Sequence, residues 1–146
     1  MNARELMTDN PETLTPDAPI TRAAQMMRDL DVGMIPIVEG DGSSRKLKGV
    51  ITDRDIVIRH VAEGHTEDHP VSRHMTEGHL HTVRPDDSDQ TVMRTMKQNQ
   101  VRRVLVVDDD DSLIGVIAQA DIADELDHPK VDRMVEEISQ PAQPNR

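Results

Sequence analysis

The chain has 146 residues, and its 17 basic and 28 acidic side chains give a formal net charge of −11 at pH 7. It contains no Cys, Phe, Tyr or Trp, which excludes disulfides, thiolate metal sites, cysteine nucleophiles and the aromatic stacking platforms of single-strand nucleic-acid binders. The acidic balance disfavours nucleic acid and anionic membranes, and no apolar run approaches the roughly 20 residues of a membrane span. We therefore expect a soluble, cytoplasmic protein of one domain or two small repeats.

The first half of the chain carries a strand–helix–strand–strand–helix pattern. Its first helix has apolar residues at i, i+3, i+4, i+7 and i+10, and its two longer strands are β-branched runs on either side of a polar turn. The apolar positions of this helix are Ile20, Ala23, Ala24, Met27 and Leu30. The predicted elements are a short strand near residue 13, a helix at 20–30, strands at 35–38 and 47–51, and a helix at about 53–63.

The second half of the chain repeats this pattern. Residues 13–17 (TLTPD) return as 82–86 (TVRPD), and residues 32–38 (VGMIPIV) return as 101–107 (VRRVLVV). The predicted elements are a short strand near residue 82, a weaker helix around 92–96, strands at 104–107 and 113–117, and a helix at about 119–126. Two copies of a unit that cannot bury its own apolar face predict an α+β fold of two β-α-β-β-α repeats, each covering the other.

The domain boundaries follow from the repeats. We expect a first repeat at residues 1–68, a second at 69–127, and a C-terminal helix with a disordered tail at 128–146. Because aromatic side chains are missing, methionines must help to fill the core. The methionines at helical spacing that we assign to the core are Met26, Met27, Met93 and Met96.

Each predicted hairpin leads into the motif Gly-h-h-x-x-x-Asp, where h is an apolar residue. The motif is GVITDRD at residues 49–55 and GVIAQAD at 115–121, and a further repeated segment is LMT at 6–8 and HMT at 74–76. Together with the repeated VGMIPIV and VRRVLVV strands, these pieces resemble a tandem cystathionine-β-synthase (CBS) domain pair, and more narrowly the small stand-alone bacterial CBS proteins.

The resemblance implies a fold and a task. Two repeats would pack sheet to sheet about a pseudo-twofold axis, and the pair would form a homodimer. Such pairs bind adenine nucleotides or adenosyl compounds (AMP, ADP, ATP, S-adenosylmethionine or NAD(H)) in two clefts between the repeats. They are ligand-sensing regulatory modules and not enzymes, so the adenosyl small molecule is a regulator rather than a cofactor, and the output passes to an unidentified effector protein.

The resemblance also assigns residues to a first cleft. Asp55 would accept the ribose hydroxyls, since a carboxylate suits a vicinal diol, and Thr52 would reach the ribose or a phosphate. Two guanidiniums of the second repeat would bind the phosphates in bidentate fashion. Adenine would lie against the start of the first hairpin. The full set is Thr13, Val32, Gly33, Met34, Ile35, Pro36, Thr52, Asp55, Arg102 and Arg103.

The second cleft is predicted to be weaker. Ala118 stands where the first motif has Thr52, and the residues that correspond to the arginine pair are Gly33 and Met34, which carry no charge. We therefore expect one competent site and one degraded site. The residues of the second cleft are Thr82, Val101, Val104, Leu105, Ala118 and Asp121.

Structural explanations compete with these assignments. Residues 52–55 are also a good helix cap, and Arg102 and Arg103 can pair with the acids at 108–111. If both clefts have lost their ligand, the chain is a purely structural or protein-interaction module.

The histidines leave a further alternative. Imidazoles suit zinc, nickel and copper and titrate near neutral pH, so a metal or pH sensor is open. Because Gly64, Pro70 and Gly78 interrupt their spacing, we expect a solvated linker and no metal site. The clustered histidines are His60, His65, His69, His74, His79 and His81.

Overall fold

The computed structural model describes residues 1–40, 44–78 and 80–125, so the predicted C-terminal helix and tail at 128–146 lie outside the described residues. The chain divides into two compact units. The first-repeat unit is Glu12–Leu80, and the second-repeat unit joins Met1–Pro11 to His81–Arg146. In the described residues, no helix is both long and apolar enough to cross a bilayer.

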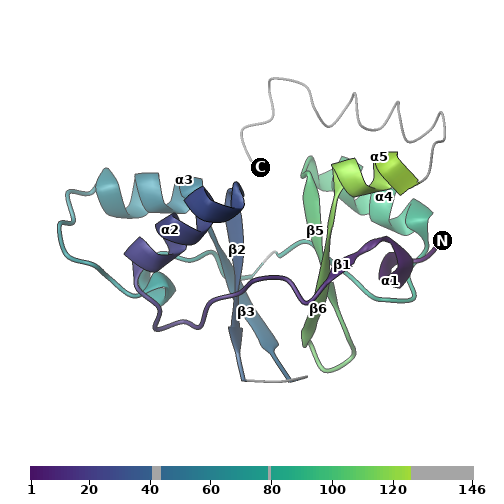
Figure 1. The fold of residues 1–146 in the computed structure, drawn as a ribbon, viewed down its shortest axis with the longest axis horizontal. Helices are drawn as coiled ribbons and strands as arrows, with labels where there is room; N and C mark the ends of the chain where they lie inside the picture. The colour runs from purple at the N-terminus through teal and green to yellow at the C-terminus, as the bar shows by residue number, and fades with distance from the viewer. Residues whose placement is uncertain (41–43, 79, 126–146) are drawn as a thin grey trace. The chain divides into compact units, whose positions relative to one another are not determined.

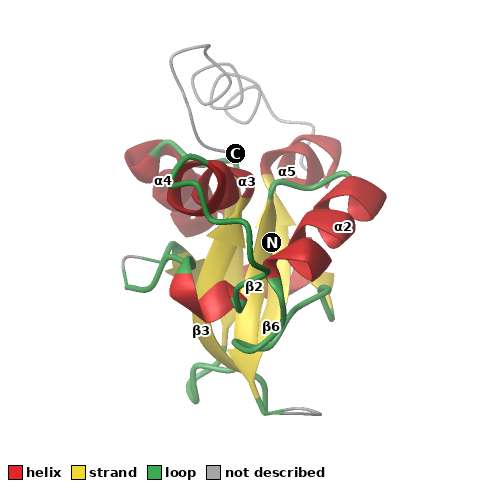
Figure 2. Ribbon diagram, turned by 90° about the vertical axis from the view of Figure 1, so that its left-hand side faces the viewer, coloured by secondary structure: helices red, strands yellow, loops and turns green. Residues whose placement is uncertain are grey.

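The first-repeat unit is built on an antiparallel pair of strands. Leu14 forms a parallel bridge to β2, and Thr76 forms an antiparallel bridge to β3, so that both edges of the pair are extended. The helices of the unit lie on one side of these strands, and α2 lies in front of them when they are seen from that side (Figures 1 and 2). The elements are α2 (Ile20–Leu30), β2 (Met34–Glu39), β3 (Lys46–Thr52), α3 (Asp53–Asp55), the π-helix η1 (Ile56–Val61) and the 3₁₀ turn η2 (Val71–Arg73).

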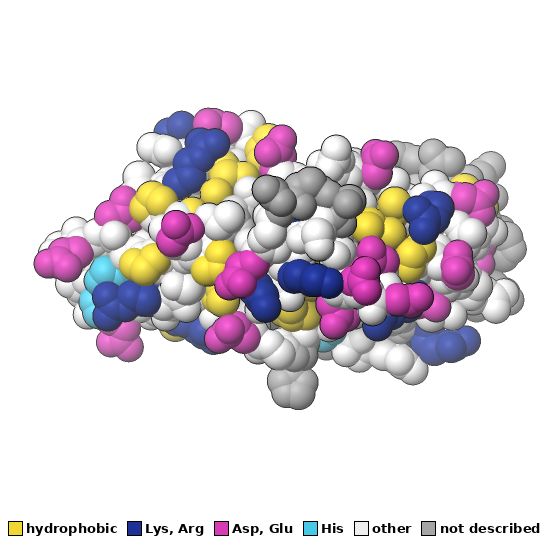
Figure 3. Space-filling model, turned by 90° about the horizontal axis from the view of Figure 1, so that it is seen from below, with side chains coloured by type: hydrophobic (Ala, Val, Ile, Leu, Met, Phe, Trp, Pro, Cys, Tyr) yellow, Lys and Arg dark blue, Asp and Glu magenta, His cyan; other side chains and the backbone are white. Residues whose placement is uncertain are grey.

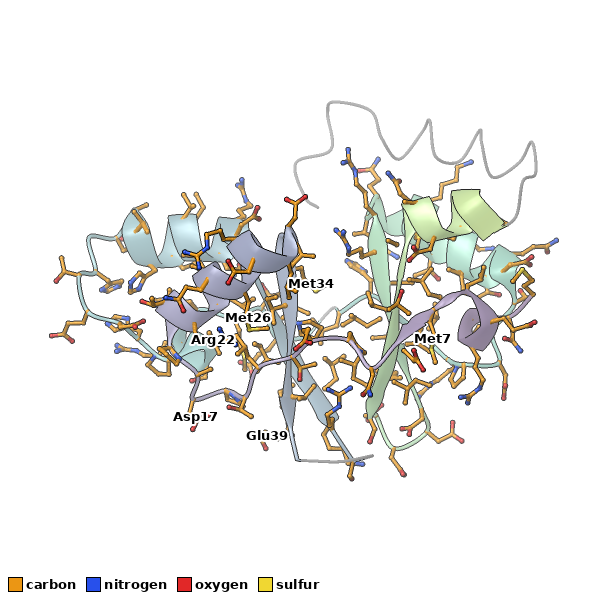
Figure 4. All side chains as sticks on the ribbon, viewed as in Figure 1. Met7, Asp17, Arg22, Met26, Met34 and Glu39 are labelled. Carbon is orange, nitrogen blue, oxygen red and sulfur yellow. The ribbon has the colours of Figure 1, made fainter. Side chains whose placement is uncertain are left out.

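The core of the first-repeat unit lies between α2 and the strands. Figure 4 shows Met26 between α2 and β2, and this side chain is buried together with Met27. Ala24 and Leu30, which we placed on the buried stripe, are exposed. The apolar face of α2 is therefore rotated toward Met26, because that face must meet a sheet. The buried members of the core are Ile20, Ala23, Met26, Met27, Ile35, Ile37, Ile51 and Val71.

The second-repeat unit has a four-stranded sheet in the order β1-β6-β5-β4. Only the β4–β5 pair is parallel, and the N-terminal strand pairs with β6 through Thr8 and Val116. Figure 1 shows its helices on one side of this sheet. The elements are α1 (Ala3–Leu6), β1 (Thr8–Asp9), β4 (Thr82–Val83), α4 (Asp89–Asn99), β5 (Arg103–Val107), β6 (Leu113–Ala118) and α5 (Gln119–Glu125).

The core of the second-repeat unit includes the N-terminal helix. Ala3 and Leu6 of α1 are buried against Val92 and Met96 of α4, and Met93 packs on the same cluster. The methionine assignments to the core are thus confirmed. The mixed helix and strand content of both units confirms the predicted α+β class.

Candidate functional site

The Thr52–Asp55 turn forms a capping box at the start of α3. The Thr52 hydroxyl accepts the amide N–H of Asp55 at 3.0 Å, and Oδ2 of Asp55 accepts the amide N–H of Thr52 at 3.0 Å. The helix cap that we gave as the structural alternative for residues 52–55 is therefore formed. It is compatible with ligand binding, because a carboxylate has lone pairs beyond the one that the cap uses.

Two more side chains hold the Asp55 carboxylate, which is only 8% exposed. The Thr76 hydroxyl donates to it, at 3.3 Å from Oδ1 and 3.2 Å from Oδ2. Nε of Arg59 lies 3.7 Å from Oδ1. Sequence reasoning assigned neither residue to a site. Thr76 lies in the repeated HMT segment, which is distant from Asp55 along the chain, and Arg59 belongs to no motif. The carboxylate is thus oriented before any ligand arrives.

The start of the first hairpin converges on the same turn. The amide N–H of Asp53 donates to the carbonyl of Gly33 at 2.9 Å, and Met34 pairs with Thr52 across the strands. A Cβ at Gly33 would lie 3.1 Å from the Asp53 carboxylate, so a larger residue there would require the Asp53 side chain to shift. Within this unit, the structure brings Gly33 and Met34 beside the Thr52–Asp55 turn, whereas Val32 packs against the hydrophobic core.

The remaining residues assigned to the first cleft in this unit lie along the strands. Ile35 is in the hydrophobic core, and Pro36 is also buried. Because side chains alternate along a strand, Met34 is on the opposite face from Ile35. Met34, labelled in Figure 4, is half-buried, as is Val32 two residues before it. The Thr13 hydroxyl accepts from Arg45 at 3.3 Å.

The second copy of the motif has a simpler cap. Oδ2 of Asp121 accepts the amide N–H of Ala118 at 3.1 Å, and alanine has no hydroxyl to return the bond. Val104 and Leu105 are buried, whereas Val101 and Thr82 are half-buried.

Arg103 begins strand β5 of the second-repeat unit, and Arg102 directly precedes it. The Arg102 carbonyl accepts the amide N–H of Gln119 at 2.8 Å, the counterpart of the Gly33–Asp53 bond. In the part of the chain that the structure describes, no ion pair joins either arginine to the acids at 108–111; Arg84 contacts that loop instead. Nε of Arg102 is buried and has no hydrogen-bond partner among the described residues.

Three histidines form a compact cluster in the first-repeat unit, which the sequence did not predict. Nδ1 of His60 lies 3.2 Å from Nε2 of His74, and Nδ1 of His69 lies 3.0 Å from the same atom. All three are buried, with exposures of 6–8%. Our expectation of a solvated linker is therefore wrong for these residues. The π-helix, the loop after it and the 3₁₀ turn bring together residues that share no helical face.

Burial has an electrostatic consequence in this cluster. Desolvation lowers the pKa of His74 and of His69 below the ordinary value, so that both favour the neutral imidazole that binds metals. His65 is exposed, and its ring centroid lies 4.7 Å from that of His69. Histidine side chains reach the surface at the left-hand end of Figure 3, beside Lys or Arg side chains. His81 lies in the other unit, and His79 is outside the described residues.

Comparison with known proteins identifies the family. The family model described as "CBS domain" matches residues 3–60 and again residues 71–128. The chain belongs to the CBS domain family. It is 36% identical over 122 residues to the CBS domain-containing protein YhcV of Bacillus subtilis, a match that covers 84% of this chain and 83% of that protein. The predicted pair of CBS repeats is thereby confirmed.

Two further CBS relatives have informative structures. Hypoxic response protein 1 of Mycobacterium tuberculosis is 32% identical over 139 residues, covering 95% of this chain and 94% of that protein. A crystal structure of Hypoxic Response Protein I with two coordinated zinc ions matches at 33% identity and a TM-score of 0.73, covering 86% of this chain and 99% of that chain. The CBS domain pair of MJ0100, in complex with 5′-methylthioadenosine and S-adenosyl-L-methionine, matches at 25% identity and a TM-score of 0.70, covering 85% and 94%.

Proposed function

We propose that this CBS pair is a regulatory module that binds an adenine nucleotide or an adenosyl derivative. The observation that carries the proposal is the convergence of Gly33 and Met34 with the Thr52–Asp55 turn in the first-repeat unit. Main-chain polar groups, the apolar Met34 and an oriented carboxylate are the combination that adenine and a ribose diol require. The adenosyl compounds in the MJ0100 structure support the same ligand class.

The proposal assigns the phosphate to Arg102 and Arg103. Neither guanidinium has an ion pair with the neighbouring acids among the described residues, and the unsatisfied Nε of Arg102 needs an acceptor. A phosphate oxygen is the acceptor that arginine binds best. The second copy of the motif keeps Asp121 but has Ala118 in place of a threonine, so we propose a weaker second site.

Calorimetric titration with AMP and with adenosine tests the arginine assignment. The double variant Arg102→Ala and Arg103→Ala should weaken AMP roughly tenfold or more, because charge-assisted bonds are lost. Adenosine, which lacks the phosphate, should keep its affinity. Arg94→Ala, which removes one exposed charge from α4, is the matched control and should change neither. Equal weakening of both ligands would contradict the assignment, and failure of AMP, ATP, S-adenosylmethionine and NADH to bind would overturn the function.

A regulatory module needs surfaces for its partners. The exposed apolar side chains of η1 are Val57, Ile58 and Val61, and apolar patches of this kind mark sites of association. We propose a homodimer that passes ligand occupancy to a separate effector protein. Sedimentation of the chain with and without AMP tests the first part, and a monomer under both conditions would contradict it.

A second candidate function is the binding of a zinc-class metal ion by His60, His69 and His74. Their nitrogen-to-nitrogen distances of 3.0 and 3.2 Å are close to the about 3.3 Å between ligands of a tetrahedral zinc with bonds of about 2.0 Å. One ligand atom from each of the three lies within 4.8 Å of the others. His65 can approach as a fourth ligand, and the zinc ions in the Hypoxic Response Protein I structure support the same metal class.

Titration of chelator-treated protein with Zn²⁺ tests the metal site. We expect about one ion per chain in the wild type and at least a tenfold loss of affinity in His74→Gln, since a buried three-histidine site has no substitute for its central ligand. His81→Gln lies in the other unit and is the control. Wild-type affinity in His74→Gln would exclude this site.

A further inference from the structure

One short segment touches both candidate sites of the first-repeat unit. Residues 74–76, which we name the linking segment, begin at His74 in the histidine cluster and end at Thr76 on the Asp55 carboxylate. The segment is fixed to β3 by a reciprocal pair of backbone bonds between Thr76 and Val50, at 2.8 and 3.0 Å. A constraint on His74 therefore acts two residues away from Thr76, whose hydroxyl bonds to the Asp55 carboxylate that we assign to the ribose.

Arg59 joins the same two places by a second route. Its Nη1 donates to the carbonyl of His74 at 3.4 Å and to that of Met75 at 3.3 Å, while its Nε faces Asp55 at 3.7 Å. His60 and Asp55 are also connected through the π-helix, a rare form of helix that occurs frequently at functional sites. The π-helix and the linking segment are thus two separate connections between the histidine cluster and the Asp55 carboxylate.

The two short contacts of the cluster compete for one atom. Both short contacts end on the same nitrogen, Nε2 of His74, which carries either one proton or one lone pair. That atom cannot satisfy both neighbours with two full hydrogen bonds of its own. A metal ion receives one lone pair from each imidazole, so it holds all three rings and the start of the linking segment in one geometry.

We propose that a metal ion on His60, His69 and His74 tightens adenosyl-ligand binding by holding Thr76 of the linking segment against Asp55. This inference rests on both parts of the proposed function. The metal ion then makes the contact between Thr76 and Asp55 more persistent than the hydrogen bonds alone do, so the protein loses less conformational entropy when the ligand binds. Because the coupling is reciprocal, the ligand tightens the metal by the same factor.

Amide hydrogen exchange tests the link without any nucleotide. The reporters are the amides of Val50, Thr52, Asp55 and Thr76. Their hydrogen bonds either join the linking segment to β3 or lie within the Asp55 turn. If their opening also breaks the metal site, Zn²⁺ at 100 times its dissociation constant slows their exchange by up to about 100-fold. The amides that join β1 to β6 in the other unit are the internal control and should not respond.

Thr76→Val separates coupling from binding, because it keeps the side-chain volume and removes only the hydroxyl. Zinc affinity should be unchanged, while AMP affinity should lose its dependence on zinc. In the wild type, zinc should tighten AMP at least about fivefold, the lower end of typical couplings. Thr8→Val, at the equivalent repeat position of the second-repeat unit, is the matched control and should keep the full zinc effect.

The outcomes separate the inference from the function on which it rests. Three results would each overturn the coupling. They are amide exchange rates that do not change with Zn²⁺, a wild-type protein that does not bind Zn²⁺, and a Thr76→Val variant in which Zn²⁺ still tightens AMP fully. Slowed exchange in a protein that binds no adenosyl compound would support the link between the cluster and Asp55 and would overturn the nucleotide function.

Discussion

Asp55 and Asp121 occupy the same position in the two repeats but have different surroundings. Asp55 is bonded by the Thr52 amide and by the Thr76 hydroxyl, and the Thr52 hydroxyl caps the Asp55 amide in return. Asp121 has the corresponding bond to the Ala118 amide, and its repeat lacks the hydroxyl that would return it. The replacement of threonine by alanine thus removes half of the capping box from the second repeat. The Asp55 turn of the first repeat therefore has more hydrogen bonds than the Asp121 turn.

The first prediction compares the stability of alanine variants at these two positions. Asp55→Ala should lower the free energy of unfolding by about 2 kcal/mol, because the partners of a buried carboxylate lose their acceptor. Asp121→Ala should cost about 1 kcal/mol or less. Urea unfolding followed by far-ultraviolet circular dichroism measures both, since the chain has no Trp or Tyr. Equal costs would show that the two caps are equivalent.

Asp68 caps α2 from a distant part of the chain. The N-cap residue Pro19 makes no side-chain bond, and Oδ1 of Asp68 accepts the amide N–H of Thr21 at 3.0 Å. That backbone hydrogen bond, followed by a bond from the Thr21 side chain, holds the pKa of Asp68 below its ordinary value. A lowered carboxyl pKa stabilises the fold above the unfolded-state pKa, and the contribution is lost as the pH falls through the folded-state value.

The second prediction follows from the lowered pKa of Asp68. Asp68→Ala should lower the thermal unfolding midpoint at pH 7, and the difference from the wild type should shrink below about pH 4 as the native carboxyl is protonated. Circular dichroism melts in the presence of a chelator measure the difference at each pH. Asp17→Ala, which removes an exposed carboxylate that bonds only locally to Thr15, is the comparison. A difference that persists unchanged at low pH would exclude the charge as its cause.

The residue-level site was only partly predictable from the sequence. The motif places Thr52 and Asp55 together, because three residues separate cap from acceptor in any helix start. His60, His69 and His74 carry no comparable spacing, since their contacts depend on how a loop returns to a helix. A repeated motif therefore reveals the Thr52–Asp55 turn, whereas no local sequence pattern reveals the histidine cluster.

The two motif glycines are explained by a crossing segment in each unit. A Cβ at Gly49 would lie 2.7 Å from the Thr76 carbonyl oxygen, and a Cβ at Gly115 would overlap the Met7 thioether (Figure 4). The LMT and HMT segments therefore pass over the glycines of the GVI strands. Sequence repetition shows that these pieces recur together, and the structure gives the steric reason.

The third prediction distinguishes the two glycines by what they meet. Gly49→Ala should cost about 1–3 kcal/mol, because a backbone carbonyl bonded to Val50 cannot move aside. Gly115→Ala should cost less, since Sδ and Cγ of Met7 can rotate away and only the Met7 Cβ, at 2.9 Å, has to shift with its backbone. Urea unfolding measures both variants. Gly64→Asn is the control, because a Cβ there meets nothing within 4 Å and asparagine tolerates its positive φ of 78°.

The predicted elements succeed where one periodicity dominates. The helix at 20–30 and the hairpins were predictable, since a helical stripe and β-branched runs leave little choice. The short strand predicted near residue 13 is reduced to a single parallel bridge between Leu14 and Ile37. The exposure of Ala24 and Leu30, which the helical stripe placed in the core, depends on the rotation of the whole helix against its sheet.

At the scale of the whole molecule, repeats and folding units do not coincide. The N-terminal segment is assigned to the unit of the second repeat, where Thr8 pairs with Val116. Its counterpart in the first-repeat unit is the segment at Thr76, which pairs with Val50. Each unit is therefore completed by a segment of the other repeat. The segment at Thr8, from the first repeat, pairs in the second-repeat unit, and the segment at Thr76, from the second repeat, pairs in the first-repeat unit. Self-similarity cannot show this exchange, because both pairings satisfy the same pattern.

The last prediction tests that exchange by deleting residues 1–9. The deletion removes Ala3 and Leu6 from a core, the strand partner of β6, and the bond from the Asp89 amide to the Met1 carbonyl at 2.9 Å. A small unit that loses buried apolar side chains and a sheet edge has little stability to spare. Slow amide exchange should therefore be lost along β6 and kept at Val50 in the first-repeat unit. Loss of protection at Val50 with β6 left intact would show that the N-terminal segment stabilises the repeat to which it belongs in sequence.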